Sequence, residues 1–256
     1  MTKADLAIDL EAARRGRFTI TSRRDTGDAV SLDDAYGLGQ DLERERVSAG
    51  WRPAGWKLGF TNQALWSKLG LDRPIRARIY HETLCSGDID SADLVQPRIE
   101  PEIVVGFGAD VPQMSDLAGI AAAVEWVAAG LEVVQCHFDR WEMTPAEAVA
   151  DAGVHAALAI GPPTAVTADD VQSLAVATCQ LLLDGVVTAT GSGADVLGGP
   201  LDALHWLLKG LPDGLRAGEI VTTGTLTQAI PLQPGQRWEH RLSASIALEP
   251  VQLRIR

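Results

Sequence analysis

The sequence predicts an α+β protein whose sheets are largely antiparallel or mixed. Helical patterns occupy the first fifth of the chain, and short strand-like segments outnumber helices after residue 55. These segments run mostly as hairpins and do not alternate with helices, which argues against an alternating parallel sheet. With 256 residues, of which 46% are hydrophobic, the chain can bury a sizeable core. We expect one large domain, or a core with a small appendage.

Two helices are expected near the N-terminus. Residues 4–15 have an amphipathic pattern, and Ser31 with Asp34 three residues later predicts the cap of a second helix, which ends at Gly50. We therefore expect an N-terminal helical segment over residues 1–50 and a core over residues 51–256 that forms one structural unit.

The core is expected to consist mainly of short strands. Strand-like runs cover residues 55–60, 76–87, 97–108, 131–138 and 154–161, and several more follow residue 218. Residues 178–193 predict a hairpin around Asp184-Gly185. Helices are expected over 63–70, 116–130 and 200–211, with a short helix or turn over 145–153. Among these, 116–130 has the clearest helical composition, between Asp116 and Gly130.

Composition excludes several classes of function. The formal net charge of −12 disfavours nucleic acid and anionic membranes as partners. No apolar run approaches the roughly 18–20 residues of a membrane span, and the N-terminus has no signal-like apolar stretch. The three widely spaced cysteines indicate neither a disulfide framework nor a thiolate metal site. We expect a soluble, cytoplasmic protein.

The stretch QPRIEPEIVV (96–105) places Glu100 and Glu102 in an apolar strand. Side chains alternate between faces in a strand, so both carboxylates lie on one face. Two interpretations are open: a solvated acidic face, or a cation that binds both groups. Glu132, in a second apolar run, favours the cation. Three carboxylates with no neighbouring His or Cys are hard oxygen ligands, which suit Mg²⁺, Mn²⁺ or Ca²⁺ better than zinc.

Lys57 is a cation within the apolar, glycine-flanked run GWKLGF (55–60). Its side chain can simply cover apolar surface with the ammonium in water. Alternatively it lies near the carboxylates, where it can bind an anionic substrate or transfer protons.

Six segments in order carry a resemblance to a known family: GWKLGFTNQALWSKLGLDRP, LVQPRIEPEIVV, AGLEVVQCHFDRW, VADAG, GSGADVLGGPLDALHWL and GEIVTTGT. They resemble the 2-keto-4-pentenoate hydratase / 4-oxalocrotonate decarboxylase family of the fumarylacetoacetate hydrolase superfamily. The resemblance extends from about residue 5 to the C-terminus. It implies a mixed β-roll core with flanking helices after the N-terminal helical segment. It also implies a homo-oligomer, which in such pathways can associate with another pathway enzyme.

The resemblance also implies a set of site residues. Glu100, Glu102 and Glu132 match the family's ligands for Mg²⁺ or Mn²⁺, and Lys57 matches its active-site lysine. The segments Leu94–Arg98 and Gly218–Thr225 match substrate-contacting regions, and the candidates there are Gln96, Arg98, Thr223, Gly224 and Thr225.

One loop departs from the family. Relatives commonly have an Asp-Asn-Ala-Ser type sequence where this chain reads Asp151-Ala152-Gly153-Val154. Asp151 is kept and could orient other groups or act as a base, but the serine hydroxyl is lost. His155 follows; it could supply a catalytic polar group or be a satisfied core histidine, because a one-residue shift on a strand reverses the face.

The expected chemistry is that of a 2-oxo or 2-hydroxy-dienoate carboxylate bound to a divalent ion. The ion acts as a Lewis acid on the C2 oxygen. Hydration of a 2-hydroxy-2,4-dienoate in meta-cleavage degradation of aromatics is the first expectation. Alternatives are a 4-oxalocrotonate-type decarboxylase and a C–C bond hydrolase of a 2-oxo acid. A non-catalytic partner subunit is a further alternative, against which the four intact charged residues argue.

Overall fold

The computed structural model describes residues 3–24, 29–69 and 71–256. Its helices are α1 (Lys3–Gly16), α2 (Leu32–Ser48), α3 (Trp66–Leu69), α4 (Leu117–Ala123), α5 (Pro145–Ala150), α6 (Ala168–Ser173) and α7 (Pro200–Lys209). The expected helix at 63–70 is a short 3₁₀ turn (Gln63–Leu65) followed by α3, and Gly70 lies outside the described residues. None of the described helices is long and apolar enough to span a membrane.

The larger of two sheets forms the centre of the molecule. Its order is β2-β1-β11-β5-β6-β7-β3, with β12 added to β5 and β8 to β6. These strands are β1 (Pro53–Gly59), β2 (Ile75–Tyr80), β3 (Leu84–Cys85), β5 (Arg98–Phe107), β6 (Val124–Val134), β7 (His155–Ile160), β8 (Thr164–Ala165), β11 (Ile220–Thr225) and β12 (Ile230–Pro231). Only residues 81–83 join β2 to β3, so the two end strands of this order are held close and the sheet is rolled.

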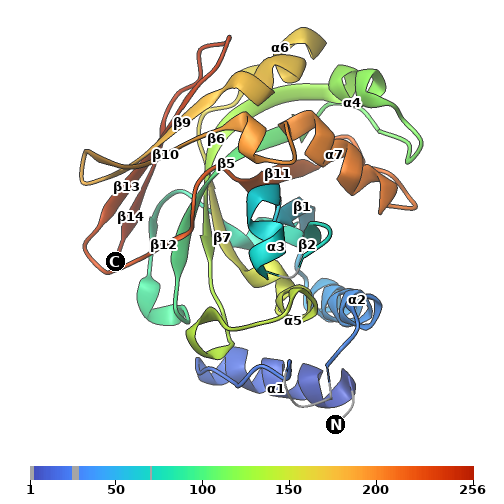
Figure 1. Cartoon of the computed structure of the whole chain (residues 1–256), viewed down its shortest axis with the longest axis vertical. Helices are drawn as coiled ribbons and strands as arrows, with labels where there is room; N and C mark the ends of the chain where they lie inside the picture. Colours follow the sequence, from blue (N-terminus) through green and yellow to red (C-terminus); the bar gives the residue numbers. More distant parts are fainter. Residues whose placement is uncertain (1–2, 25–28, 70) are drawn as a thin grey trace.

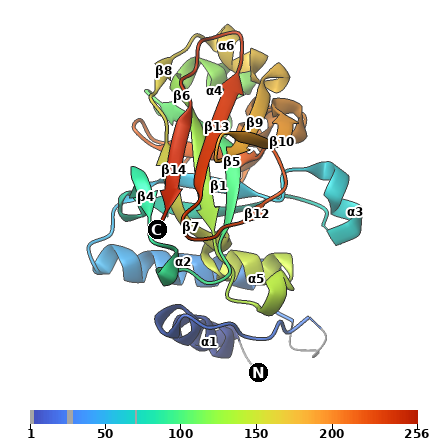
Figure 2. The ribbon, with the colours of Figure 1, turned by 90° about the vertical axis from the view of Figure 1, so that its left-hand side faces the viewer.

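The second sheet has the order β10-β9-β13-β14-β4 (Figures 1 and 2). It contains β4 (Gly87–Ile89), β9 (Thr178–Leu183), β10 (Val186–Ser192), β13 (Arg237–Ser243) and β14 (Val251–Ile255). The expected hairpin at 178–193 is confirmed as β9 and β10, paired antiparallel around Asp184 and Gly185. Parallel pairs such as β1 with β11 make the architecture mixed, as the sequence predicts.

Apolar clusters hold these layers together, and two of them join the helices to the sheets. The larger cluster joins both sheets to α4, α6 and α7. A smaller one joins α1 and α2 to α5 and the end of β6, through Leu10, Leu38, Val134 and Val149. Figure 1 shows α1, α2 and α5 gathered at the end of the molecule that carries the N-terminus. The N-terminal helices therefore share a core with α5, and the boundary at residue 50 stays a prediction.

The prediction of a helix over residues 116–130 is correct for the first half of the segment and wrong for the second. α4 ends at Ala123, and residues 124–134 form β6, the partner of β5 over ten residue pairs. Helix formers such as Ala128 and Ala129 are overridden by tertiary context, because intrinsic propensity is weak beside the pairing of a central strand. Gly130 does not end a helix: a Cβ there would come within 2.5 Å of Val104 Cγ2 on the facing strand.

Candidate metal and active site

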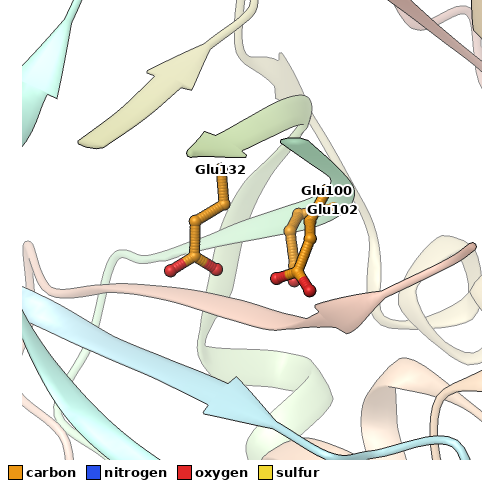
Figure 3. A group of neighbouring side chains, drawn as sticks. All are labelled: Glu100, Glu102 and Glu132. Atoms are coloured by element: carbon orange, nitrogen blue, oxygen red, sulfur yellow. The ribbon is translucent and has the colours of Figure 1, made fainter. Parts of the chain in front are cut away.

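Three carboxylates converge on one face of the rolled sheet. Glu100 and Glu102 lie on β5, and the antiparallel register places Glu132 of β6 directly opposite Glu100. One oxygen from each of the three lies within 4.8 Å of the others. Figure 3 shows the side chains projecting from their two strands in the same direction. Glu102 and Glu132 are fully buried and Glu100 is half-buried, so the fully solvated acidic face is excluded.

Each buried carboxylate uses one oxygen within the protein and leaves the other without a partner. Glu102 Oε2 accepts the Gly224 N–H at 2.6 Å, and Glu132 Oε1 lies 2.8 Å from His155 Nδ1. Glu102 Oε1 and Glu132 Oε2 are buried with no hydrogen-bond partner among the described residues. Because buried polar atoms are almost always satisfied, two such oxygens in one carboxylate cluster fit a hard divalent cation.

The charges of the cluster shift its pKa values in opposite directions. Burial, together with the charge of Glu132, raises the pKa of Glu100 to about 7. Burial and the two neighbouring glutamates raise the pKa of Glu102 well above its usual value. For Glu132, burial is outweighed by Lys57 and His155, so its pKa is lowered. Without a cation, Glu100 and Glu102 therefore resist ionisation. A bound dication would offset the repulsion between the ionised carboxylates.

Lys57 is brought to the carboxylates by β1. It is 1% exposed, and its Nζ lies 3.4 Å from Glu132 Oε1 and donates to the Gly153 carbonyl at 3.1 Å. Burial alone would lower the pKa of Lys57, but the three glutamates outweigh it and raise the pKa. A solvated, snorkelling lysine is therefore excluded, and the ammonium is one of the site's charged groups.

His155 reaches the same cluster through a β-bulge. Glu132 is paired with Leu158, and the register shifts between Val133 and Val134 so that Val134 faces His155. The extra residue returns His155 to the face that carries Glu132, which simple alternation would not do. The histidine is buried as a core residue would be, yet its ring hydrogen-bonds a carboxylate of the site.

The loop before His155 is an unusual left-handed turn. Ala152, Gly153 and Val154 all have positive φ, at 56°, 64° and 57°. Only glycine is accommodated at 153, since a Cβ there would lie 2.5 Å from Ala77 Cβ. The side chain of Val154 packs in the smaller apolar cluster with α1, α2 and α5. The turn aims the Gly153 carbonyl at Lys57, at the cost of strain in two non-glycine residues.

Asp151 is not part of the carboxylate cluster. Its oxygens accept the backbone N–H of His137 at 3.0 Å and face the His137 Nδ1 at 2.9 Å, and Arg14 of α1 lies 3.4 Å away. These contacts fix the start of the left-handed turn. They favour an orienting role for Asp151 over that of a base.

Gln96 and Arg98 have different surroundings. The Gln96 amide donates to the carbonyls of Cys136 and Phe138, so it holds the segment after β6 in place. Arg98 shares the strand face of Glu100, lies over the Trp141 ring at 4.3 Å, and makes no ion pair among the described residues. Of the two, Arg98 has a charged group free for an anionic ligand.

In the segment Gly218–Thr225 the backbone is closer to the carboxylates than the expected side chains are. The Thr223 and Thr225 hydroxyls donate to the carbonyls of Ile103 and Thr227, and Gly224 donates its N–H to Glu102. The sequence prediction missed Thr222, which is in register with Lys57 and has a buried hydroxyl without a partner in the described chain.

Two further threonines were also missed. The buried Thr61 hydroxyl lacks a partner within the described residues and lies against Gly224, and Thr83 contacts His155. Nothing in their local sequence distinguishes them from ordinary polar residues.

Comparisons with known proteins show the family of the chain. Residues 74–249 match the family described as fumarylacetoacetate (FAA) hydrolase, C-terminal. The chain is 30% identical to a 2-keto-4-pentenoate hydratase of Paraburkholderia xenovorans, covering 93% of this chain and 90% of the relative. It is also 30% identical to a 4-oxalocrotonate decarboxylase of a Pseudomonas species, covering 88% of each.

Solved structures share the fold. The 4-oxalocrotonate decarboxylase from Pseudomonas putida G7, complexed with magnesium and adipate, superposes with a TM-score of 0.89 at 25% identity, covering 99% of this chain and 97% of that one. A fumarylpyruvate hydrolase from Pseudomonas aeruginosa, in complex with Mn²⁺ and pyruvate, has a TM-score of 0.56 at 16% identity over 78% of this chain and 88% of that one, a likeness of fold alone.

The fold and the carboxylate cluster thus define a protein of the rolled-sheet class with a site for a divalent metal. The chain belongs to the fumarylacetoacetate hydrolase family.

Proposed function

We propose that the protein is a divalent-metal-dependent hydro-lyase that adds water to a 2-hydroxy-2,4-dienoate in the meta-cleavage degradation of aromatics. The observation that supports this proposal is the cluster of Glu100, Glu102 and Glu132, in which two buried oxygens have no partner in the described chain. Relatives named as 2-keto-4-pentenoate hydratases, such as that of Paraburkholderia xenovorans, support the reaction class.

The three carboxylates would hold Mg²⁺ or Mn²⁺. When bound, such an ion supplies a Lewis acid that stabilises negative charge on the C2 oxygen of a 2-oxo acid. Lys57 holds a proton at Nζ beside this position, kept there by the Glu132 carboxylate and the Gly153 carbonyl. We assign it the transfer of that proton to a substrate carbon. We assign the donation of hydrogen bonds to the substrate to the hydroxyls of Thr61 and Thr222, which are buried and have no partner among the described residues.

A 4-oxalocrotonate-type decarboxylase is the second candidate. The observation that favours it is Arg98, a guanidinium without an acidic partner among the described residues, on the strand face of Glu100. A second substrate carboxylate would pair with it. The metal site serves both reactions equally, so it does not discriminate between them. A C–C hydrolase uses the same electron sink, but no contact in the described chain favours it specifically.

We also propose that the enzyme works in the cytoplasm as a homo-oligomer that can associate with another enzyme of its pathway. The chemistry described above does not require that association. The acidic surface, with a net charge of −12, fits a soluble enzyme that binds neither nucleic acid nor anionic membrane.

The test uses the purified protein with Mg²⁺ or Mn²⁺. The ultraviolet absorbance of 2-hydroxypenta-2,4-dienoate is followed in one assay and CO₂ release from 2-oxohex-3-enedioate in another. Loss of the first substrate identifies a hydratase, and CO₂ from the second identifies a decarboxylase. Turnover should stop on chelation and in the Glu132→Gln variant. Turnover that persists after chelation would reject the metal-dependent reaction.

A further inference from the structure

His155 is held at both ring nitrogens. Its Nδ1 lies 2.8 Å from Glu132 Oε1, and its Nε2 lies 2.8 Å from Thr83 Oγ1. Thr83 belongs to the three-residue 3₁₀ turn between β2 and β3 (His81–Thr83), far from His155 in sequence. The rolled sheet brings this turn against the start of β7, so the contact depends on closure of the roll.

These contacts fix the orientation of the His155 ring. The Glu132 carboxylate only accepts hydrogen bonds, so His155 donates to it from Nδ1. The Thr83 hydroxyl, which also contacts the Tyr80 carbonyl at 2.9 Å, holds Nε2 on the other side of the ring. The ring cannot turn over without placing a carbon against Thr83. His155 consequently presents Nδ1 to Glu132 in one orientation.

The result is that Glu132 has one oxygen engaged and one free. Oε1 is shared by His155 and Lys57, whereas Oε2 has no partner in the described chain. Glu102 repeats the arrangement: its Oε2 accepts from the Gly224 amide, and its Oε1 has no partner among the residues that the structure describes. The two buried carboxylates are thus each prepared to offer a single oxygen to a cation.

We propose that Thr83 and His155 are positioning residues that restrict Glu132 to one-oxygen metal ligation and so keep coordination positions open for a chelating 2-oxo acid. The inference rests on the proposed metal site and adds the reason for its geometry. Mg²⁺ demands near-octahedral coordination, and carboxylates can bind through one oxygen or two. If Glu132 used both oxygens, it would occupy a position that the substrate or a water requires.

The test compares Thr83→Val, which removes the hydroxyl at nearly constant shape, with Thr83→Ser, which keeps it. His155→Leu removes the contact to Glu132 directly. Each protein is first titrated with Mn²⁺, and its fold is checked by circular dichroism. Water-proton relaxation then reports the waters on the bound Mn²⁺, and calorimetry gives the affinity for oxalate, a simple chelating dianion.

We expect Thr83→Ser to match the unmodified protein. Thr83→Val and His155→Leu should bind Mn²⁺ with fewer exchangeable waters and bind oxalate about 10-fold more weakly, the lower end of what loss of an outer contact to a metal ligand costs. Unchanged relaxation and oxalate affinity in both variants would overturn the proposal. So would a Thr83→Ser protein as impaired as Thr83→Val, because the loss would then reflect packing. Failure of the unmodified protein to bind Mn²⁺ would instead overturn the metal site itself, and the first titration detects that separately.

Discussion

Replacing Lys57 with methionine is expected to destabilise the metal-free protein by about 3–5 kcal/mol, the cost of breaking a buried ion pair from one side. Lys57 and Glu132 are 1% and 0% exposed, so water screens neither charge. The variant loses the 3.4 Å contact between Nζ and Glu132 Oε1 and the 3.1 Å hydrogen bond to the Gly153 carbonyl. His155 is then the sole remaining donor to that carboxylate among the described residues.

Urea unfolding in the presence of a chelator, followed by circular dichroism, measures this loss. The double variant Lys57→Met/Glu132→Gln removes both charges together and should be more stable than the sum of the single losses predicts, by about 1 kcal/mol or more. The matched control is Arg15→Met, which breaks the exposed pair of Arg15 with Glu11 and should cost less than about 1 kcal/mol. A Lys57→Met loss no larger than this control, or strictly additive single losses, would refute the buried-pair reasoning.

Three further predictions follow from other parts of the structure. Burial lowers the pKa of His240 to about 4 from 6.5, so below pH 6.5 the unfolded chain binds a proton that the folded protein does not. The free energy of unfolding should therefore keep its full His240 contribution above pH 6.5 and fall by about 3 kcal/mol as the pH drops toward 4. Urea unfolding of His240→Gln across this pH range should show a free energy of unfolding without that part of the acid dependence. A pH profile identical to that of the unmodified protein would contradict this role of His240. Arg98→Met should weaken adipate binding to the Mn²⁺-loaded protein about 10-fold, because it removes one charge-assisted contact, and should leave acetate binding unchanged. Equal losses of affinity for both ligands in calorimetry would exclude that Arg98 binds a second substrate carboxylate. Gly224 has φ 118°, and a Cβ added there would lie 2.0 Å from Thr61 Oγ1, so Gly224→Ala should lower the Mn²⁺ affinity at least about 10-fold. The control Gly235→Ala, at φ 88° in open space, should leave the affinity unchanged. Equal affinities of the two variants in a Mn²⁺ titration would rule out the Gly224 amide as support for Glu102.

The sequence by itself determined which residues can serve as ligands. Strand alternation places Glu100 and Glu102 on one face, and an acid within the apolar run around Glu132 identifies a third candidate. The hairpin at Asp184-Gly185 and the cap at Ser31 were likewise readable, because turn and cap preferences act over a few neighbouring residues. The ordered motifs also indicated the family that the comparisons establish.

Only the tertiary structure decided how these groups meet. Whether residues 124–130 are helix or strand depends on pairing with β5, and the register that sets Glu132 opposite Glu100 is a non-local property. A bulge, invisible to alternation, turns His155 toward Glu132, and the closure of the roll brings Thr83 to its other nitrogen. Local sequence fixes periodicity and turns, but hydrogen-bond partners distant along the chain are selected by the packing of the whole molecule.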